Sequence, residues 1–258
     1  MKYQQIIYYQ DELRDDFGTS VKRIKPLPKS YKYVPKNIFF RGFSAFVYWG
    51  LVKPLAWLYM KIRFYHRIKN NSVVKPLKTG YFIYGNHTTI IGDALMPNIV
   101  SFKTKNFIIT GEQTNSLTPI LPLLNAIGAL PLTDNLNEKK ELIKAIKTRI
   151  QQKASITIYP EAHVWPYYTD IRPYTAESFK YAVKLNVPVV CMTNCFQKRR
   201  FRKRPKIVTY IDGPFYPEEG LSPNENAQRL RDAVYQKMKE RTKEYSTYSY
   251  FQYKRKED

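Results

Sequence analysis

The chain has 258 residues, and its 43% hydrophobic and 15% aromatic content is enough to bury a sizeable core, which excludes wholesale disorder. A formal net charge of +22, from 43 Lys and Arg against 21 Asp and Glu, favours an acidic partner: nucleic acid, an anionic membrane surface or an acidic carrier protein. The two cysteines, Cys191 and Cys195, are too few for a disulfide framework or a Cys-built zinc site and fit a reducing compartment. A local disulfide between them is the alternative.

The first 36 residues are polar and predict a peripheral arm. Asp11, Glu12, Asp15 and Asp16 follow the N-terminus closely, so this segment lacks the apolar core of a secretory signal peptide. Prolines at positions 26, 28 and 35 favour an extended connector over a helix. We therefore expect the bulk of the protein to be cytosolic.

Aromatic residues crowd the segment 37–75. Its apolar stretch is interrupted by Lys53-Pro54 and falls short of the roughly 20 consecutive apolar residues that a membrane-spanning helix needs. Tryptophans, tyrosines and basic flanks are typical of a helix that lies in the headgroup region of a bilayer. We expect such an interfacial helix, or a helix pair bent at Pro54. An aromatic helix packed on the domain is the alternative.

Residues 81–95 contain the first candidate site. An apolar run that ends at Gly85-Asn86 predicts a buried strand, and His87 follows at once. Asp93 comes six residues later, near the start of an expected helix. An imidazole can accept a proton near neutral pH, and a carboxylate on its other nitrogen fixes the tautomer and stabilises the imidazolium.

The spacing of these two residues constrains the local structure. On one continuous helix, residues six apart are separated by about 600° of rotation, which leaves their side chains roughly 120° apart around the axis. His87 and Asp93 can therefore meet only if His87 stays in the loop and the chain turns before Asp93. We expect Gly92 to allow this turn through a positive φ. A surface-loop histidine followed by an aspartate at a helix N-terminus is the alternative.

The rest of the chain alternates predicted strands and helices. Strands are predicted at 106–110, 128–132, 155–159, 187–192 and 207–211, and helices at 117–126, 135–153, 175–185 and 224–240. Such alternation is typical of an α/β domain, which we place at 76–258.

A second candidate site follows the predicted strand 155–159. Pro160 breaks the hydrogen-bond ladder of this strand, and Glu161 follows directly after the end of the strand. Because two strands are each followed by a polar side chain, His87 and Glu161, we expect one shared crevice. For Glu161 alone, a loop carboxylate is the alternative.

These motifs together resemble those of the glycerolipid acyltransferase family, the lysophosphatidate acyltransferases and their relatives, over about half of the chain. Asn86-His87 with Asp93 is similar to the first block of the family, and Tyr159-Pro160-Glu161 is similar to its Phe-Pro-Glu-Gly block. Residues 187–190 are similar to its final strand block, and 128–132 stand where the second block is expected.

The resemblance implies a fold and an activity. The fold is a mixed, mostly parallel sheet flanked by helices, preceded here by the aromatic segment 37–75. His87 would be the general base that deprotonates the acceptor hydroxyl, and Asp93 would orient it. The hydroxyl would then attack the thioester carbonyl of acyl-CoA or acyl carrier protein, with no cofactor or metal beyond this co-substrate. Glu161 would help to hold the acceptor, and we assign Asn86 to substrate binding as well.

The chain departs from the family pattern at three places. Five residues rather than four separate His87 from Asp93. Thr133-Asp134 stand where the second block carries an arginine, and Ala162-His163-Val164 replace the Gly-Thr-Arg of the third block. Two expected phosphate ligands are therefore missing, although a phosphate dianion in a half-buried site needs guanidinium or ammonium partners.

Other residues are candidates for the missing contacts. Arg172, Lys180 or the basic run 198–206 could supply them, or the acceptor is a different lysolipid or a lipid-linked alcohol. His163 could contact the substrate in place of the family's threonine, or cap a loop.

We therefore predict a peripheral or monotopic enzyme at the cytoplasmic face of the cell membrane. It would move a fatty acyl group to the hydroxyl of a lysophospholipid or glycerolipid-like acceptor, with the aromatic segment docked on an anionic membrane surface. A thioesterase or lipid hydrolase that uses the same dyad with water is one alternative. A basic nucleic-acid-binding protein is another; it ranks lower because the run 198–206, which is either a solvated loop or a phosphate binder, lacks a recognisable nucleic-acid module.

Overall fold

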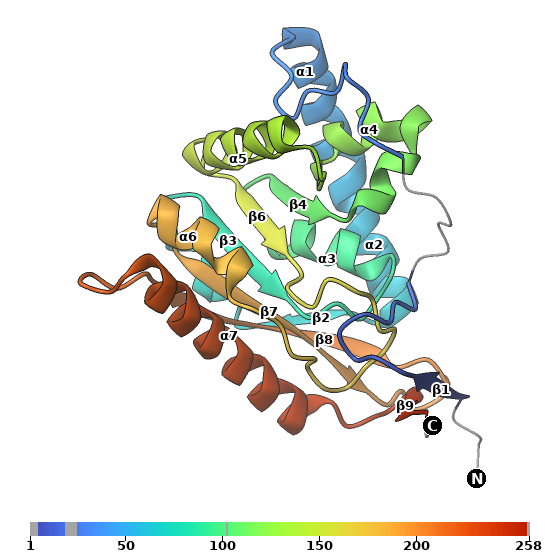
Figure 1. Ribbon diagram of the computed structural model, residues 1–258. Coiled ribbons are helices and arrows are strands. Elements are labelled where there is room, and N and C mark those ends of the chain that lie inside the picture. Colours follow the sequence, from blue (N-terminus) through green and yellow to red (C-terminus); the bar gives the residue numbers. More distant parts are fainter. Residues whose placement is uncertain (1–4, 19–24, 102, 257–258) are drawn as a thin grey trace.

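The computed structural model describes residues 5–18, 25–101 and 103–256 (Figure 1). Within these residues one seven-stranded sheet has the order β2-β8-β7-β3-β6-β4-β5. Neighbouring strands of this sheet run parallel except for the antiparallel pair β7 and β8. The strands are β2 (Arg67–Lys69), β3 (Tyr81–Gly85), β4 (Asn106–Thr110), β5 (Ala129–Pro131), β6 (Ser155–Ile158), β7 (Val189–Gln197) and β8 (Lys206–Phe215).

Helices cover both faces of the sheet, and β3 is buried at every residue, as expected of a parallel strand between two helical layers. Phe82 and Tyr84 point into a core shared with α5 (Leu136–Gln151), α6 (Lys180–Leu185) and α7 (Pro223–Tyr245). Tyr81 and Ile83 point the other way, into a core shared with α2 (Lys53–Phe64) and α3 (Gly92–Val100). The predicted mixed sheet flanked by helices is thus confirmed (Figure 1).

Short helical turns connect several of these elements. They are η2 (Asn71–Val74), η3 (Glu112–Ser116), η4 (Thr118–Ile120), α4 (Leu121–Ala126) and η5 (Glu177–Phe179). The predicted helix 117–126 is therefore a 3₁₀ turn followed by α4, because Pro122 lacks an N–H and fits best in the first turn of a helix. The basic run 198–206 forms the loop between β7 and β8 and enters β8 at its last residue.

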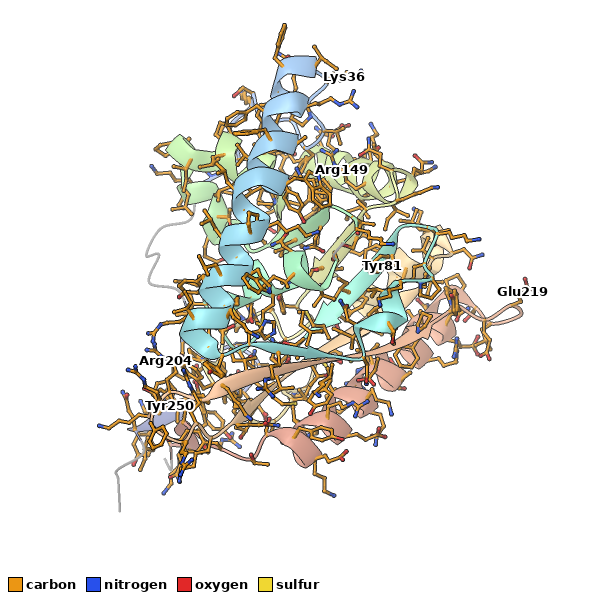
Figure 2. All side chains as sticks on the ribbon, turned by 180° about the vertical axis from the view of Figure 1, so that it is seen from behind. Lys36, Tyr81, Arg149, Arg204, Glu219 and Tyr250 are labelled. Carbon is orange, nitrogen blue, oxygen red and sulfur yellow. The ribbon has the colours of Figure 1, made fainter. Side chains whose placement is uncertain are left out.

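Residues 38–64 of the aromatic segment form one uninterrupted helical run (Figure 2). It consists of α1 (Ile38–Phe46), the π-helical turn η1 (Val47–Val52) and α2. The π turn ends two residues before Pro54, whose missing N–H leaves one backbone hydrogen bond of an α-helix unmade in any case. Of the two predicted forms, a single helix and a pair bent at Pro54, the structure has the single run.

The two sides of this helical run differ. One side packs on the domain through Tyr48, Ala56, Met60 and Phe64, all of which are buried. The other side exposes large apolar side chains along its whole length: Ile38, Phe39, Phe43, Phe46, Trp49, Leu51, Leu55, Trp57, Leu58 and Ile62. Within the described residues, no helix combines the length and the apolar character needed to cross a membrane.

The N-terminal arm lies against the C-terminal tail. β1 (Gln5–Tyr9) pairs in parallel with β9 (Phe251–Arg255) in a separate two-stranded sheet, which sequence analysis did not predict. Residues 1–4 and 19–24 of the predicted arm lie outside the described residues. At the other boundary, β2 falls within the predicted aromatic segment but is a strand of the main sheet, paired with β8.

Both cysteines lie in β7 as buried free thiols, so the alternative of a local disulfide is not realised. Burial raises the pKa of each thiol to about 12. A thiol that stays protonated and inaccessible is a packing residue rather than a nucleophile.

Candidate active site

The turn after β3 is fastened to β7 by Asn86. This side chain is fully buried; its amide donates to the carbonyl of Asn194 at 3.1 Å, and its oxygen accepts the N–H of Asn194 at 2.8 Å. Both ends of the amide are therefore occupied by backbone groups. The structure thus places Asn86 as an anchor of the turn that presents His87, away from the walls of the cavity described below.

His87 and Asp93 meet, as predicted. Nδ1 of His87 lies 2.7 Å from Oδ2 of Asp93. The same oxygen accepts the N–H groups of Thr88 at 2.8 Å and Thr89 at 2.9 Å, and Oδ1 accepts the Thr89 hydroxyl at 2.6 Å. Because a carboxylate only accepts, Nδ1 carries the proton of the neutral imidazole and Nε2 carries the lone pair. This is the tautomer that a general base requires.

The prediction that Gly92 turns the chain through a positive φ is wrong. α3 already begins at Gly92, with Asp93 in its first turn, and Gly92 is absent from the described residues with positive φ. Gly92 instead permits a close approach, because a Cβ on it would lie 2.4 Å from Oγ1 of Thr89. The turn itself is stabilised by the backbone N–H groups of Thr88 and Thr89, which both donate to Asp93.

Tyr159 supports both members of this pair. Its ring stacks on the imidazole of His87, with centroids 4.5 Å apart and planes at 16°. Its hydroxyl donates to the backbone carbonyl of Asp93 at 2.6 Å. Burial, together with the nearby Asp93 charge, holds the pKa of this phenol well above its usual value, so it stays a donor. Sequence analysis named Tyr159 only as part of a motif and missed this contact.

Glu161 and Arg172 lie behind the loop rather than on an open surface. Oε2 of Glu161 accepts the backbone N–H of His87 at 3.1 Å and the Arg172 guanidinium at 3.3 Å, while Oε1 accepts the Arg172 N–H at 3.2 Å. Burial raises the pKa of the Glu161 carboxyl, and the Arg172 guanidinium opposes that rise. Arg172 is 1% exposed, donates to the carbonyl of His163 and lies over the ring of Trp165. The two side chains thus brace the loops around His87.

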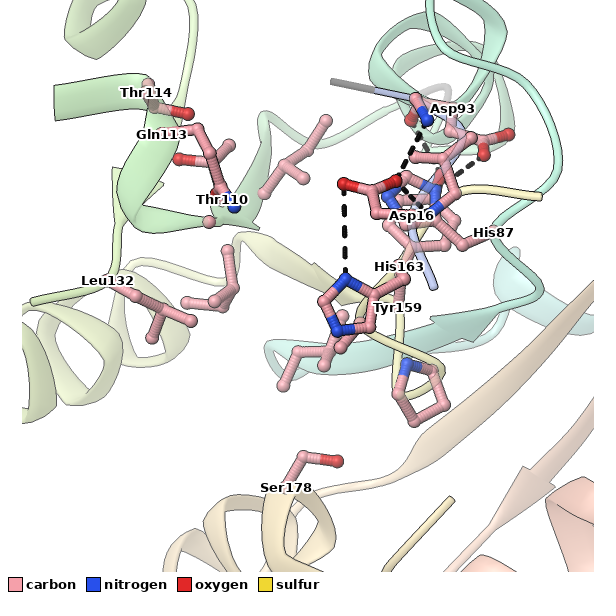
Figure 3. A pocket seen from close by; sticks show the side chains of 18 of the residues that line it. Asp16, His87, Asp93, Thr110, Gln113, Thr114, Leu132, Tyr159, His163 and Ser178 are labelled. Atoms are coloured by element: carbon pink, nitrogen blue, oxygen red, sulfur yellow. Dashed lines mark hydrogen bonds and ion pairs between the residues drawn. The ribbon is translucent and has the colours of Figure 1, made fainter. Parts of the chain in front are cut away.

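A cavity of about 690 Å³ opens beside His87, where β3, β4 and β6 end (Figure 3). His87, Asp93 and Tyr159 lie on its wall, and Ile108, Leu132 and Ile158 are among its apolar lining. An elongated apolar group and a few polar atoms suit such a space. The shared crevice predicted from the two strand ends is therefore present, with His87 on its wall and Glu161 bonded to the His87 backbone from behind.

The charge of this cavity is opposite to that of the whole chain. Among the described residues that line it, none is Lys or Arg, whereas Asp16, Asp93 and Glu177 supply carboxylates. The proposed replacements for the missing phosphate ligands lie elsewhere. Arg172 is buried against Glu161, Lys180 donates to Glu177 at 2.7 Å without joining the lining, and no described residue of the run 198–206 lines the cavity.

The N-terminal arm contributes Asp16 to the cavity, close to His163 (Figure 3). Oδ1 of Asp16 accepts the N–H of Val164 at 3.0 Å, and its Oδ2 lies 4.0 Å from Nδ1 of His163. His163 lines the cavity, and its contact with substrate stays a prediction. Sequence analysis missed Asp16, which is 148 residues away from Val164. The acidic cluster at 11–16 in a strongly basic chain was the one available signal.

Comparison with known proteins agrees with this architecture. No curated protein sequence matches the chain. Among solved structures, the chain is similar in fold to the crystal structure of the 1-acyl-sn-glycerophosphate (LPA) acyltransferase PlsC from Thermotoga maritima, with a TM-score of 0.51 and 16% sequence identity over 78% of this chain and 93% of that one. A family model described as Acyltransferase matches residues 37–194, which is more than half of the chain. The protein therefore belongs to the acyltransferase family and is an acyltransferase.

Proposed function

We propose that the protein transfers a fatty acyl group from the thioester of acyl-CoA or acyl carrier protein to the hydroxyl of a lysolipid, a lysophospholipid or glycerolipid-like acceptor. The contact of 2.7 Å between His87 and Asp93, on the wall of a cavity of about 690 Å³, carries this proposal. The family match supports the reaction class. The structural relative is described as acting on 1-acyl-sn-glycerophosphate, which suggests a lysolipid as the kind of acceptor.

The proposed steps of acyl transfer follow from the geometry of His87 and Asp93. As the acceptor hydroxyl attacks the carbonyl carbon of the thioester, Nε2 of His87 takes its proton. The buried Asp93 carboxylate, 1% exposed, stabilises the imidazolium that forms. The tetrahedral intermediate collapses with cleavage of the carbon–sulfur bond, and the proton passes from Nε2 to the departing thiolate. The products are an ester and a free thiol.

The charge of the cavity narrows the proposed acceptor. A phosphate monoester beside the reacting hydroxyl would be a dianion, and the described lining contains no Lys or Arg but has the carboxylates of Asp16 and Glu177. We therefore favour an acceptor that is neutral or carries an amine or further hydroxyl near Asp16 and His163. Lysophosphatidate is disfavoured on this ground.

The helical run α1-η1-α2 supports a location at a membrane surface. Its exposed side carries phenylalanines and tryptophans, and the run includes Arg41 near its start and Lys61 and Arg63 near its end. Such a composition favours the headgroup region, where aromatic rings bury their apolar parts and basic residues meet anionic lipid. We propose that the enzyme docks there as a peripheral protein on the cytoplasmic face.

An acyl-transfer assay tests the reaction. Labelled acyl-CoA and acyl carrier protein are each supplied with a panel of lysolipids in anionic vesicles, with wild type compared with His87→Ala. We expect label in diacyl lipid with wild type and almost none with His87→Ala, because the base contributes about 10²–10⁴-fold. Equal thermal unfolding midpoints of the two proteins are the control for folding.

Two outcomes would contradict the proposal. Undiminished acyl transfer by His87→Ala would exclude His87 as the general base. Release of free fatty acid at a rate that lysolipids do not change would point to water as the acceptor and hence to a thioesterase or lipid hydrolase.

A further inference from the structure

A second hollow, of about 420 Å³, lies between the first half of the aromatic helical run and the edge of the sheet. Phe40, Ser44 and Trp49 line it from the helix, and Lys105 and Arg149 line it from the domain. Figure 2 labels Arg149 beside this part of the helical run, with Lys36 near the start of that run.

This hollow is far from His87. Lys105 directly precedes β4, and Lys153 and Ala154 directly precede β6, so the hollow is at the amino-terminal edge of these parallel strands. The acyl-transfer cavity is at their carboxyl-terminal edge. At about 3.3 Å per residue, the four residues of β6 alone separate the two edges by roughly 13 Å.

The lining is strongly cationic. Among the described residues that form it are Arg41, Lys103, Lys105, Arg149 and Lys153, and none of the described lining residues is Asp or Glu. The ion pairs found among the described residues do not include any of these five cations. Like charges gathered without a counter-charge repel one another, and a bound anion relieves that repulsion.

Two of the cations are fixed in place and partly withdrawn from water. Nζ of Lys105 donates to the Ser44 hydroxyl at 2.7 Å and to the Ala126 carbonyl at 2.6 Å, above the rings of Tyr48 and Phe107. Burial, with the nearby Arg149 charge, lowers the pKa of Lys105 to about 8. A binding anion would favour the charged form of this amine.

Arg149 is held in the same way. Its guanidinium lies 4.4 Å from the centre of the Phe107 ring and donates to Gln152 and to the carbonyl of Tyr33. Its Nε is buried without a hydrogen-bond partner among the described residues. Each Nη group of Arg149 uses one N–H in these hydrogen bonds and has a second, and an immobilised guanidinium of this kind is suited to a phosphate oxygen.

The surface next to the hollow indicates which kind of anion the hollow binds. The wall opposite the four cations of the domain is the aromatic helix, on which the exposed Phe39, Phe43 and Phe46 are neighbours of the lining residues in α1. A phosphate attached to acyl chains can satisfy the cations while its chains cover these rings, whereas a free phosphate leaves the rings in water.

We propose that this hollow binds the phosphate of an anionic phospholipid in the bilayer, as a headgroup site separate from the acyl-transfer cavity. The site rests on the proposed membrane docking but not on the acyl-transfer chemistry. It gives docking a preference for anionic lipid that apolar side chains alone cannot give.

Vesicle binding by the full chain tests the site. Co-sedimentation is measured with phosphatidylglycerol–phosphatidylcholine vesicles and with pure phosphatidylcholine vesicles. We expect Arg149→Gln to weaken binding to the anionic vesicles by about tenfold or more, and to leave binding to phosphatidylcholine unchanged. Lys147→Gln, which removes one charge from the exposed side of the same helix α5, is the matched control and should change binding less than about twofold.

A second variant keeps the test valid if Arg149→Gln is unstable. Lys103→Gln with Lys153→Gln removes two exposed cations of the lining and should also weaken binding to the anionic vesicles selectively. Neither variant should lower acyl transfer to a detergent-dispersed acceptor, because His87 is at the other edge of the sheet.

Four results would overturn the site. If Arg149→Gln and Lys147→Gln weaken binding equally, the attraction is diffuse and docking stands without a headgroup site. If inorganic phosphate displaces the protein from vesicles and binds the protein as tightly as the vesicles do, the ligand is free phosphate. If an oligonucleotide, and not vesicles, binds in an Arg149-dependent manner, the partner is nucleic acid. If wild type binds no vesicles, the proposed membrane docking is refuted together with the site. If wild type binds vesicles as expected but transfers no acyl group, only the proposed reaction is refuted.

Discussion

The two hollows of this protein are at opposite edges of one sheet and carry opposite charges. The cavity at the carboxyl ends of the strands has carboxylates from Asp16, Asp93 and Glu177, while the hollow at their amino ends has five cations. Total charge therefore says little about the site of catalysis. In a chain of +22, five Lys and Arg residues line the second hollow, whereas the described walls of the catalytic cavity contain no Lys or Arg.

The difference also separates two tasks. Acyl transfer needs one oriented base and a space for an acyl chain, which a buried carboxylate and an apolar cavity supply. Attachment to an anionic surface needs positive charge beside an apolar face, which the helical run and the second hollow supply. Variants of one region should therefore leave the task of the other intact.

The largest effect is expected from Asp93→Asn. An amide cannot stabilise the imidazolium as a carboxylate does, so kcat should fall by about 10²–10⁴-fold while vesicle binding stays unchanged. Steady-state kinetics with a detergent-dispersed acceptor and vesicle co-sedimentation measure the two quantities. The separation of tasks would be broken if vesicle binding fell in parallel with kcat, or if kcat fell by less than about tenfold.

A smaller effect is expected from the exposed rings of α1. Phe39→Ser should weaken binding to phosphatidylcholine and anionic vesicles alike by roughly 30-fold, because withdrawing one phenylalanine from the bilayer costs about 2 kcal/mol. Ile143→Ser, which changes an exposed apolar residue on α5, is the control and should have little effect. A loss confined to anionic vesicles would show that the helix acts through charge rather than through its apolar face.

The smallest effect is expected at the cavity wall. Asp16→Lys should shift the ratio of kcat/KM for lysophosphatidate over a neutral lysolipid by about tenfold towards lysophosphatidate, because it replaces an anion with a cation there. Parallel assays of the two acceptors measure this ratio. An unchanged ratio would show that the headgroup does not approach Asp16, and the proposed preference would then need another cause.

Much of the fold was predictable because it follows from local patterns. The buried run before Gly85-Asn86 and the strand before Pro160 are encoded by consecutive apolar residues and by the turn chemistry that ends them. Three exceptions were β1, β2 and β9. All three are edge strands with mostly exposed side chains, so they lack the apolar pattern by which strands are predicted.

The candidate site was predictable only in part. His87 and Asp93 are six residues apart, so a single loop brings them together and the sequence indicates their pairing. Asn86, Glu161 and Arg172 were predicted to contact substrate, but the structure shows them hydrogen-bonded inside the protein. Sequence motifs give the identity of a polar residue, but its exposure depends on which loops cover it.

The sequence by itself determined the strand ends, the His87–Asp93 pair and the aromatic helix, because each depends on residues that are neighbours along the chain. Tertiary structure alone decided that Asp16 lines the cavity and that Arg172 is buried against Glu161 instead. It also decided that Arg41, Lys105 and Arg149 line one hollow. These arrangements join segments tens to more than a hundred residues apart. Their physical cause is the order in which the strands pair and the way the helices pack on them, which no local periodicity specifies.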